Sequence, residues 1–156
     1  MSIELIKYDE KYMCLIEKWE KRRELFKYLS HTRPKFLLTG NEKEEKSTLF
    51  FMIKVDEKII GAVWLEDITK VEAKLSIYIA EISKRGKGIG ETIIKKLIKL
   101  VFNDLKLKKL YLHARETNTR AIKLYEKCGF RITYKYPSRH FSDGSYQGIY
   151  EMCLNF

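Results

Sequence analysis

Residues 74–105 of the chain read KLSIYIAEISKRGKGIGETIIKKLIKLVFNDL. Alternating apolar and polar side chains predict a β-strand over 74–79, and apolar residues at helical spacing, with lysines opposite, predict an amphipathic helix over 88–105. The glycine-rich segment RGKGIG, residues 85–90, separates the two. A strand that leads through glycines into a helix predicts a turn whose backbone N–H groups, at the positive end of the helix dipole, can bind a phosphate or pyrophosphate.

Two widespread phosphate-binding motifs do not fit this turn. In the dinucleotide-binding motif GxGxxG, started at Gly86, the third glycine position is occupied by Glu91, whose carboxylate would repel a pyrophosphate. In the Walker A motif a Ser or Thr follows Gly-Lys, whereas Gly88 follows Lys87 here. The remaining pattern is Arg-x-x-Gly-x-Gly over residues 85–90.

A second motif lies downstream, after a predicted strand over 109–114. Residues 118–130 read NTRAIKLYEKCGF. Asn118 is a favourable helix N-cap and Gly129 a favourable helix end, so a helix is predicted over 119–128. Tyr125 is the one residue of the motif that such structural preferences do not explain.

The other segments complete a mixed α/β pattern. A helix is predicted to begin after the N-cap Asp9, to carry Trp19 and Leu25 and to break near Ser30, and residues 40–47 are predicted to form a solvated loop. No linker or internal repeat divides the chain, so a single domain with a largely antiparallel sheet is predicted over residues 1–156. Further strands are predicted over 3–7, 48–55, 59–66, 130–136 and 149–154, the second and third as an antiparallel hairpin.

The composition indicates a basic protein without a membrane span. The 156 residues include 31 Lys+Arg and 21 Asp+Glu, a formal net charge of +10, which predicts either an anionic partner or a merely solubilising surface. No apolar stretch approaches the roughly 20 residues that a transmembrane helix needs. Cys14, Cys128 and Cys153 are widely spaced, as free thiols in a reducing cytoplasm would be, and no Cys/His spacing indicates a metal site.

Together the two motifs resemble the signatures of the GCN5-related N-acetyltransferase (GNAT) superfamily. Residues 85–90 are similar to its acetyl-coenzyme A motif, and residues 118–130 to its second signature, NxxAxxLYxKxGF. The resemblance covers Glu72 to Phe130, and more loosely the order of elements from Ile3 to Leu154. It implies an α/β fold of the GNAT type, with a mostly antiparallel twisted sheet of six to seven strands and about four helices.

The resemblance also implies an enzyme: an acyltransferase that moves an acetyl group from acetyl-CoA directly to an amine, with neither an acyl-enzyme nor a metal. Backbone N–H groups of 85–90 would bind the pyrophosphate, the strand edge 77–79 would pair with the pantetheine arm, and an N–H near Ile79 would polarise the thioester carbonyl. Asn118 would hydrogen-bond the pantetheine arm. The implied coenzyme-binding residues are Ile77, Tyr78, Ile79, Arg85, Gly86, Lys87, Gly88, Ile89, Gly90, Asn118 and Tyr125.

The resemblance assigns Tyr125 the role of general acid. A phenol with a pKa near 10 can protonate the departing thiolate and is itself neutral at physiological pH. For the base that deprotonates the amine, Glu81 and Glu66 rank first among carboxylates at strand ends, ahead of Asp67 and Glu72.

The sequence leaves several functions open. A coenzyme A-binding domain without turnover would carry the same turn. A nucleic-acid-binding module would use the net charge, but no nucleic-acid-binding motif supports it. The acceptor is a small molecule or a protein amine of unspecified identity, a homodimer is open, and a membrane is not expected. Arg120 or Lys127 would lie near the 3′-phosphate of the coenzyme. His113 is interpreted as a structural residue, whereas His140 and Asp143 lie in an aromatic, polar loop that either shapes the acceptor pocket or only turns the chain.

Overall fold

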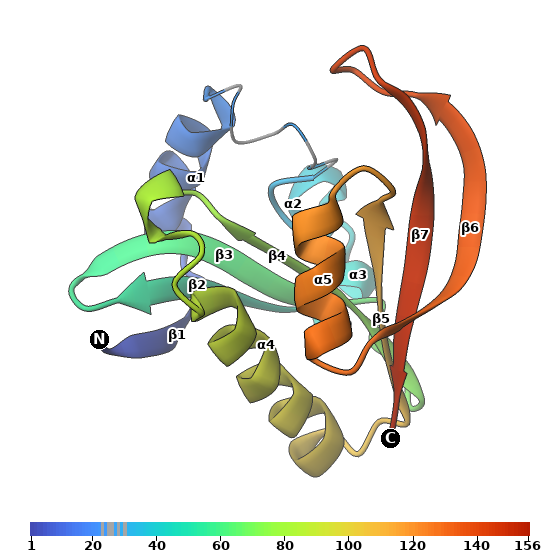
Figure 1. Cartoon of the computed structure of the whole chain (residues 1–156). Coiled ribbons are helices and arrows are strands. Elements are labelled where there is room, and N and C mark those ends of the chain that lie inside the picture. The colour runs from blue at the N-terminus through green and yellow to red at the C-terminus, as the bar shows by residue number, and fades with distance from the viewer. Residues whose placement is uncertain (23, 25–26, 28, 30) are drawn as a thin grey trace.

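The computed structural model describes residues 1–22, 24, 27, 29 and 31–156. In this part of the chain one seven-stranded sheet has the order β1-β2-β3-β4-β5-β7-β6 (Figure 1). All neighbouring strands are antiparallel except β4 and β5. The strands are β1 (Ile3–Lys7), β2 (Leu49–Val55), β3 (Lys58–Glu66), β4 (Glu72–Ile79), β5 (Lys109–Arg115), β6 (Arg131–His140) and β7 (Tyr146–Asn155). The predicted mixed α/β sheet of six to seven strands is confirmed.

The helices lie on both faces of this sheet. The α-helices are α1 (Met13–Glu20), α2 (Phe36–Thr39), α3 (Glu42–Lys46), α4 (Ile89–Lys99) and α5 (Thr119–Lys127). Short 3-10 helices form η1 (Glu10–Tyr12) and η3 (Ile82–Lys84), and α4 continues as the π-helical segment η4 (Leu100–Asp104). None of the described helices is long and apolar enough to cross a membrane.

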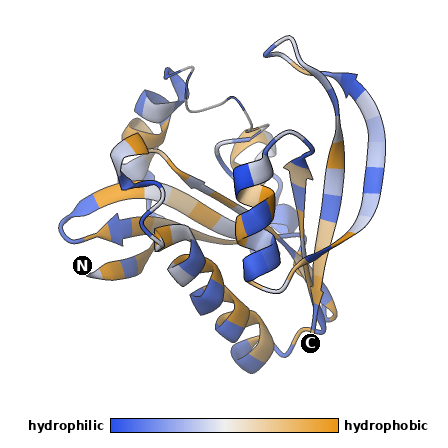
Figure 2. Cartoon of the chain, viewed as in Figure 1, coloured by the Kyte–Doolittle hydropathy of each residue, from blue (hydrophilic) through white to orange (hydrophobic). Residues whose placement is uncertain are grey.

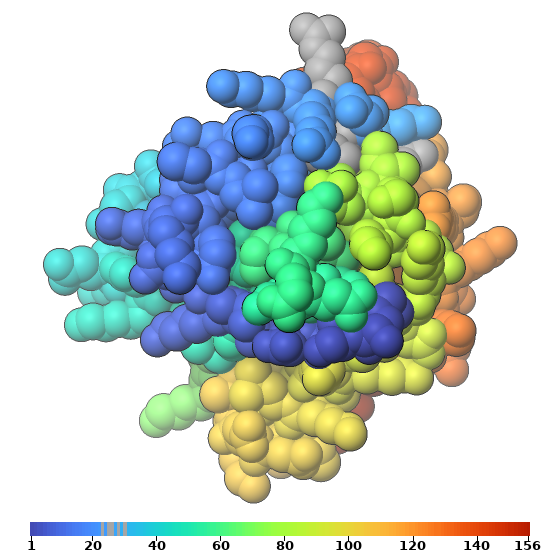
Figure 3. Space-filling view, turned by 90° about the vertical axis from the view of Figure 1, so that its left-hand side faces the viewer, coloured from blue at the N-terminus to red at the C-terminus, as the bar shows by residue number. Residues whose placement is uncertain are grey.

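Two hydrophobic clusters hold these layers together because side chains alternate between the faces of each strand. Val63 and Leu65 of β3 pack with α4 and α5, whereas Ala62 and Trp64 pack with α1 through Trp19. Figure 2 shows the resulting hydrophobic stripes along the central strands and along α4. In Figure 3 the sheet edge made by β1 and the β2–β3 hairpin separates α1 from the end of α4.

The structure corrects three predicted elements. Residues 40–47 are not a loop: Asn41 caps α3 by accepting a hydrogen bond from Glu44 N, and acidic residues in the first turn favour the helix dipole. The long helix changes to π geometry after Lys99. The last two strands extend to 131–140 and 146–155, so His140 ends a strand.

The first helix begins as predicted but ends earlier. The Asp9 side chain accepts from Lys11 N at the start of η1. α1 already ends at Glu20. Leu25 and Ser30, which the sequence assigned to the last part of this helix, lie outside the described residues.

Candidate functional site

β4 and β5 separate at the centre of the sheet. They pair only between residues 72–74 and 109–111. Beyond Lys74 this edge of β4 has no strand partner among the described residues, and the two strands diverge in Figure 1. An open strand edge inside a sheet offers a row of unpaired backbone donors and acceptors to a ligand.

The hydrogen bonds at the two ends of β4 identify the groups on this open edge. Val71 O accepts from Lys109 N at the start of β5, and Ala80 N donates to Ile60 O on β3. Backbone groups of successive strand residues point to opposite edges, so the N–H and C=O groups of Ile77 and Ile79 lie on the β5 side. These are the positions at which the sequence predicts pairing with a pantetheine arm.

The glycine turn lies at the end of the same strand. Gly86 and Gly88 have φ angles of 75° and 79°, which glycine adopts without steric cost. Gly88 is the N-cap of α4, and no side chain caps this helix. The first N–H groups of α4 therefore remain available to an anion, which the helix dipole also favours.

Two guanidinium groups lie next to each other at this turn. Arg85 donates two hydrogen bonds to Ile79 O, with N–O distances of 3.1 and 2.9 Å, which fixes the turn on the end of β4. A Cβ placed on Gly86 would lie 2.8 Å from Arg120 Nη2, so the Arg120 guanidinium lies directly against the turn. Burial, and then the charge of Arg120, lower the pKa of Arg85. Like charges held together in this way indicate an anion site.

The negative charge of Glu91, which was a reason against a dinucleotide-binding motif, is balanced by two lysines in the structure. Its carboxylate contacts Lys95 Nζ at 2.8 Å and Lys127 Nζ at 3.0 Å. The hydrogen bonds from Lys95 and from Lys127 lower the pKa of Glu91. Its negative charge is therefore directed to lysines and does not oppose an anion at the turn.

A pocket of about 870 Å³ joins the turn, the open edge of β4 and α5. Its volume is in the range of small-molecule sites. Lys87 and the two leading candidates for the base, Glu66 and Glu81, are not part of its lining. The predicted coenzyme residues that line it are Ile77, Tyr78, Ile79, Arg85, Gly86, Gly88, Ile89, Gly90, Asn118 and Tyr125.

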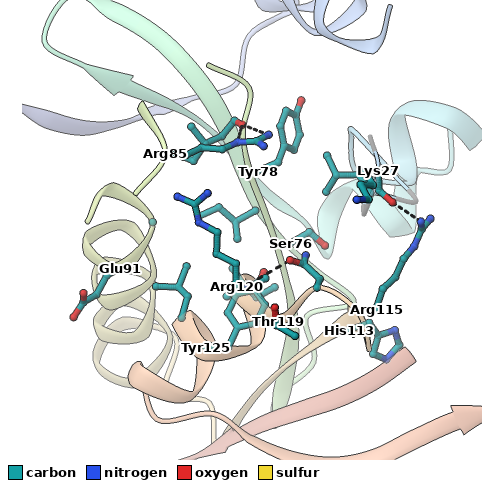
Figure 4. Close-up of a pocket in the computed structure, with 18 of the residues that line it drawn as sticks. Lys27, Ser76, Tyr78, Arg85, Glu91, His113, Arg115, Thr119, Arg120 and Tyr125 are labelled. Atoms are coloured by element: carbon teal, nitrogen blue, oxygen red, sulfur yellow. Dashed lines mark hydrogen bonds between the residues drawn. The ribbon is translucent and has the colours of Figure 1, made fainter. Parts of the chain in front are cut away.

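Tyr125 of α5 and Asn118, the N-cap residue of this helix, line the pocket, and Figure 4 shows Tyr125 there. Burial raises the pKa of Tyr125 to about 12, so the phenol is protonated throughout the neutral range. No described residue hydrogen-bonds its hydroxyl. Asn118 Oδ1 accepts from Ala121 N at the start of α5, which leaves the side-chain amide N–H groups for a ligand.

The two glutamates predicted as bases have other partners. Glu81 forms ion pairs with Arg22 at 3.8 Å and with Lys58 at 3.4 Å. Glu66 is buried and accepts a hydrogen bond from Lys35 N at 3.1 Å. The structure therefore brings neither carboxylate together with Tyr125.

The opposite wall of the pocket contains residues that the sequence did not single out as functional. Lys74 and Ser76 of β4 and Arg115 of β5 line it, together with His113, which the sequence assigned a structural role. Figure 4 shows Arg85 and Arg120 on one side, Arg115 and His113 on the other, and Ser76 between them. Alternation along the strand places His113 and Arg115 on one face of β5, and this pattern in the sequence could have indicated that the two line the same site.

Burial, followed by the positive charge of Lys74, lowers the pKa of His113. Its ring Nε2 lies 3.4 Å from Glu151 Oε1 on β7. The ring is therefore neutral at pH 7, with one nitrogen able to accept a proton. No described group of three His, Cys, Asp or Glu side chains could hold a metal ion.

This geometry is suited to an elongated, phosphate-bearing ligand that lies along an interrupted sheet. A family model described as Acetyltransferase (GNAT) family matches residues 13–130. The chain therefore belongs to the GNAT acetyltransferase family. The sequence resemblance to this superfamily is confirmed.

Individual relatives agree with this assignment. Spermidine N(1)-acetyltransferase of Vibrio cholerae is 33% identical over 107 residues, which cover 67% of this chain and 61% of that protein. Acetyltransferase PseH of Campylobacter jejuni is 29% identical over 89 residues, covering 57% and 55%. The alignments thus span less than two thirds of either relative. The crystal structure of V. cholerae spermidine N-acetyltransferase with CoA and spermine has a TM-score of 0.83 at 25% identity, covering 98% of this chain and 95% of that one.

Proposed function

We propose that the chain is an acetyl-CoA-dependent N-acetyltransferase that transfers the acetyl group to an amine by direct attack. One observation carries the proposal: the open edge of β4 leads from the anion site at the glycine turn into a pocket that also contains Tyr125. A pocket that binds nucleic acid or only the coenzyme would not need a phenol without a partner at this place.

Each part of the pocket has a role in this proposal. The first N–H groups of α4 and Arg120 bind the phosphates, and the N–H and C=O groups of Ile77 pair with the pantetheine arm. Asn118 donates to the same arm. The Arg85 guanidinium occupies Ile79 O and so holds strand and turn in register.

The reaction follows from these positions. A neutral amine attacks the thioester carbon, and the carbonyl oxygen gains negative charge, which the N–H of Ile77 or Ile79 on the open edge stabilises. The C–S bond then breaks, and the departing sulfur takes the proton of Tyr125. The amine loses one proton, which a base in the pocket or water takes up, so the products are an amide and free CoA.

The base in this scheme is His113 instead of Glu81 or Glu66, because the ring lines the pocket and is neutral at pH 7. The proposal expects His113→Gln to lower kcat/KM about 100-fold near pH 7. Neutral His113 is the active form, and the pKa of His113 is lowered from its usual 6.5. The wild-type rate should therefore fall only below pH 6.5. A pH profile tests this: an acid limb that is unchanged in His113→Gln would remove His113 from the role.

Calorimetry with acetyl-CoA, followed by detection of free thiol with a panel of amines, tests the function as a whole. The expected results are binding at micromolar to submillimolar coenzyme and amine-dependent thiol release. Binding without release for any amine would favour a domain that only binds the coenzyme. Absence of binding, with salt-sensitive affinity for DNA or RNA, would favour the nucleic-acid alternative.

Arg120→Gln tests the anion site. Loss of a charged hydrogen bond to a phosphate costs about 1.5 kcal/mol, so the Kd for acetyl-CoA should rise about tenfold. Arg131→Gln, an exposed position on β6 away from the pocket, is the matched control. Equal affinities of the two variants would show that Arg120 does not bind the coenzyme.

The proposal also includes the cellular compartment and the oligomeric state of the protein. Cys14, Cys128 and Cys153 are free thiols, which supports a reducing compartment such as the cytoplasm. A homodimer stays a prediction, and light scattering on the protein in solution would decide it.

A further inference from the structure

The wall of the pocket that faces away from the glycine turn is positively charged. Lys74, Arg115 and Arg139 line it, and we call these three residues the basic wall. Arg115 and Arg139 lie over the same ring, Phe141, with guanidinium carbons 4.0 and 4.8 Å from its centroid. Two cations are therefore held close together at this end, as at the coenzyme end.

At the surface of the pocket the basic wall has little negative charge beside it. Glu66 lies opposite Lys74 in the β3–β4 register, but it is buried, accepts a hydrogen bond from Lys35 N and does not line the pocket. Asp143 Oδ2 contacts Arg115 Nη1 at 3.2 Å, and Glu151 faces His113, but neither carboxylate lines the pocket. Among the described residues the carboxylates that line the pocket are Glu24 and Glu91, and Glu91 pairs with Lys95 and Lys127. Lys74 and Arg139 form no ion pair with any described residue. The five positions outside the described set carry no Asp or Glu.

Two buried donors at this end lack an acceptor. The Arg115 side chain is 5% exposed and donates through Nη1 to Lys27 O at 2.7 Å and to Asp143, but its Nε is unsatisfied. Trp64 is 1% exposed, lines the pocket from β3, and its Nε1 is likewise without an acceptor among the described residues. Both nitrogens are covered by protein atoms, so the groups that a ligand can reach at this end are the charged side chains of the basic wall.

We propose that the amine acceptor carries an anionic group, a carboxylate or a phosphate, which binds against the basic wall while the amine reaches the thioester near Ser76. This inference rests on the proposed acetyltransferase function and specifies its substrate class. Cationic side chains bind anionic oxygens and repel a second cation. A polyamine, named as the substrate of two similar proteins, is therefore a poor acceptor for this chain.

Matched amines that differ in one anionic group test this. Lysine is compared with cadaverine, which lacks the carboxylate, and O-phosphoethanolamine with ethanolamine, which lacks the phosphate; spermidine completes the set. Thiol release is followed at saturating acetyl-CoA. The expected result is a kcat/KM at least about tenfold higher for one anionic member than for its counterpart, with spermidine lowest. The pair that shows the larger ratio identifies carboxylate or phosphate.

Variants locate the effect. Lys74→Gln and Arg139→Gln should each reduce the ratio at least about threefold. Because Lys74 also lowers the pKa of His113, its variant is judged by the ratio of the two members and not by either rate alone. Lys99→Gln removes the same charge from the exposed face of α4, outside the pocket, and should leave the ratio unchanged. Because Arg115 is buried, the melting temperature of Arg115→Lys is measured together with its kcat/KM ratio.

The outcomes separate this inference from the proposed function. A preference for spermidine or cadaverine would overturn the proposal of an anionic acceptor. The same holds if Lys74→Gln and Arg139→Gln leave the ratio unchanged. In both cases the proposed acetyltransferase function would still stand. If no amine is acetylated, the same compounds are titrated by calorimetry into the protein–CoA complex. Equal or tighter binding of the members without an anionic group would then overturn the inference. Failure to bind acetyl-CoA would overturn the proposed function itself.

Discussion

Replacing Tyr125 with Phe lowers kcat about 100-fold and changes the Kd for acetyl-CoA by less than about twofold. The phenol ring packs against Phe130, with centroids 6.1 Å apart, and Phe keeps this contact. Only the hydroxyl is lost, and with it the proton for the departing thiolate, a contribution that is typically 100-fold or more for a general acid. Since the pKa of Tyr125 is about 12, its ionisation should not limit the rate at neutral pH.

The matched control is Tyr111→Phe. Burial also raises the pKa of Tyr111 to about 12, but this residue does not line the pocket. Its variant should keep the wild-type kcat. Single-turnover thiol release and calorimetry measure the two quantities separately. A Tyr125→Phe enzyme with unchanged kcat, or one whose Kd rises as much as kcat falls, would remove Tyr125 from the role of acid.

Replacing Gly61 with Ala destabilises the fold by about 3 kcal/mol, or about 6–12 °C in Tm for a chain of this size. A Cβ on Gly61 would lie 2.2 Å from Tyr78 O and 3.1 Å from Ile79 Cα. Both atoms belong to the backbone of β4, which cannot move aside as a flexible side chain would. The displaced strand carries the open edge, so affinity for acetyl-CoA should fall as well.

Gly40→Ala is the control for backbone strain alone. Gly40 has a φ of 70°, and its Cβ would meet no atom within 4 Å. The expected cost is about 1–2 kcal/mol, with unchanged coenzyme affinity. Thermal unfolding of the two variants, each with and without acetyl-CoA, makes the comparison. If Gly61→Ala unfolds no earlier than Gly40→Ala, the close approach of β3 and β4 is not a constraint.

Local sequence signals predicted the elements of the site well. Period-two alternation and helical periodicity over 74–105 predicted β4 and α4, and Gly86 and Gly88 predicted the turn, because each of these depends on neighbours in the chain. The prediction of a solvated loop over 40–47 was wrong, although the signals for the helix are also local. Its charge was read as exposure alone, whereas Asn41 and the acidic first turn stabilise a short helix.

Contacts between distant segments could not be predicted in this way. Glu81 and Glu66 were ranked by their place at strand ends, but their partners Lys58 and Lys35 come from other parts of the chain. Conversely, His113 and Lys74 are far apart in sequence and share one wall only because β4 and β5 pair and then diverge.

The sequence by itself determined the family and the glycine turn, because glycines with positive φ, a helix N-terminus and a capped α5 are set by residues close together in the chain. Only the tertiary structure decided the acceptor end. The charge, burial and unsatisfied donors around Arg115 arise from β3, β4, β5 and β6 together. Long-range strand pairing brings these groups into one pocket, and no pattern of neighbouring residues in the sequence predicts that pairing.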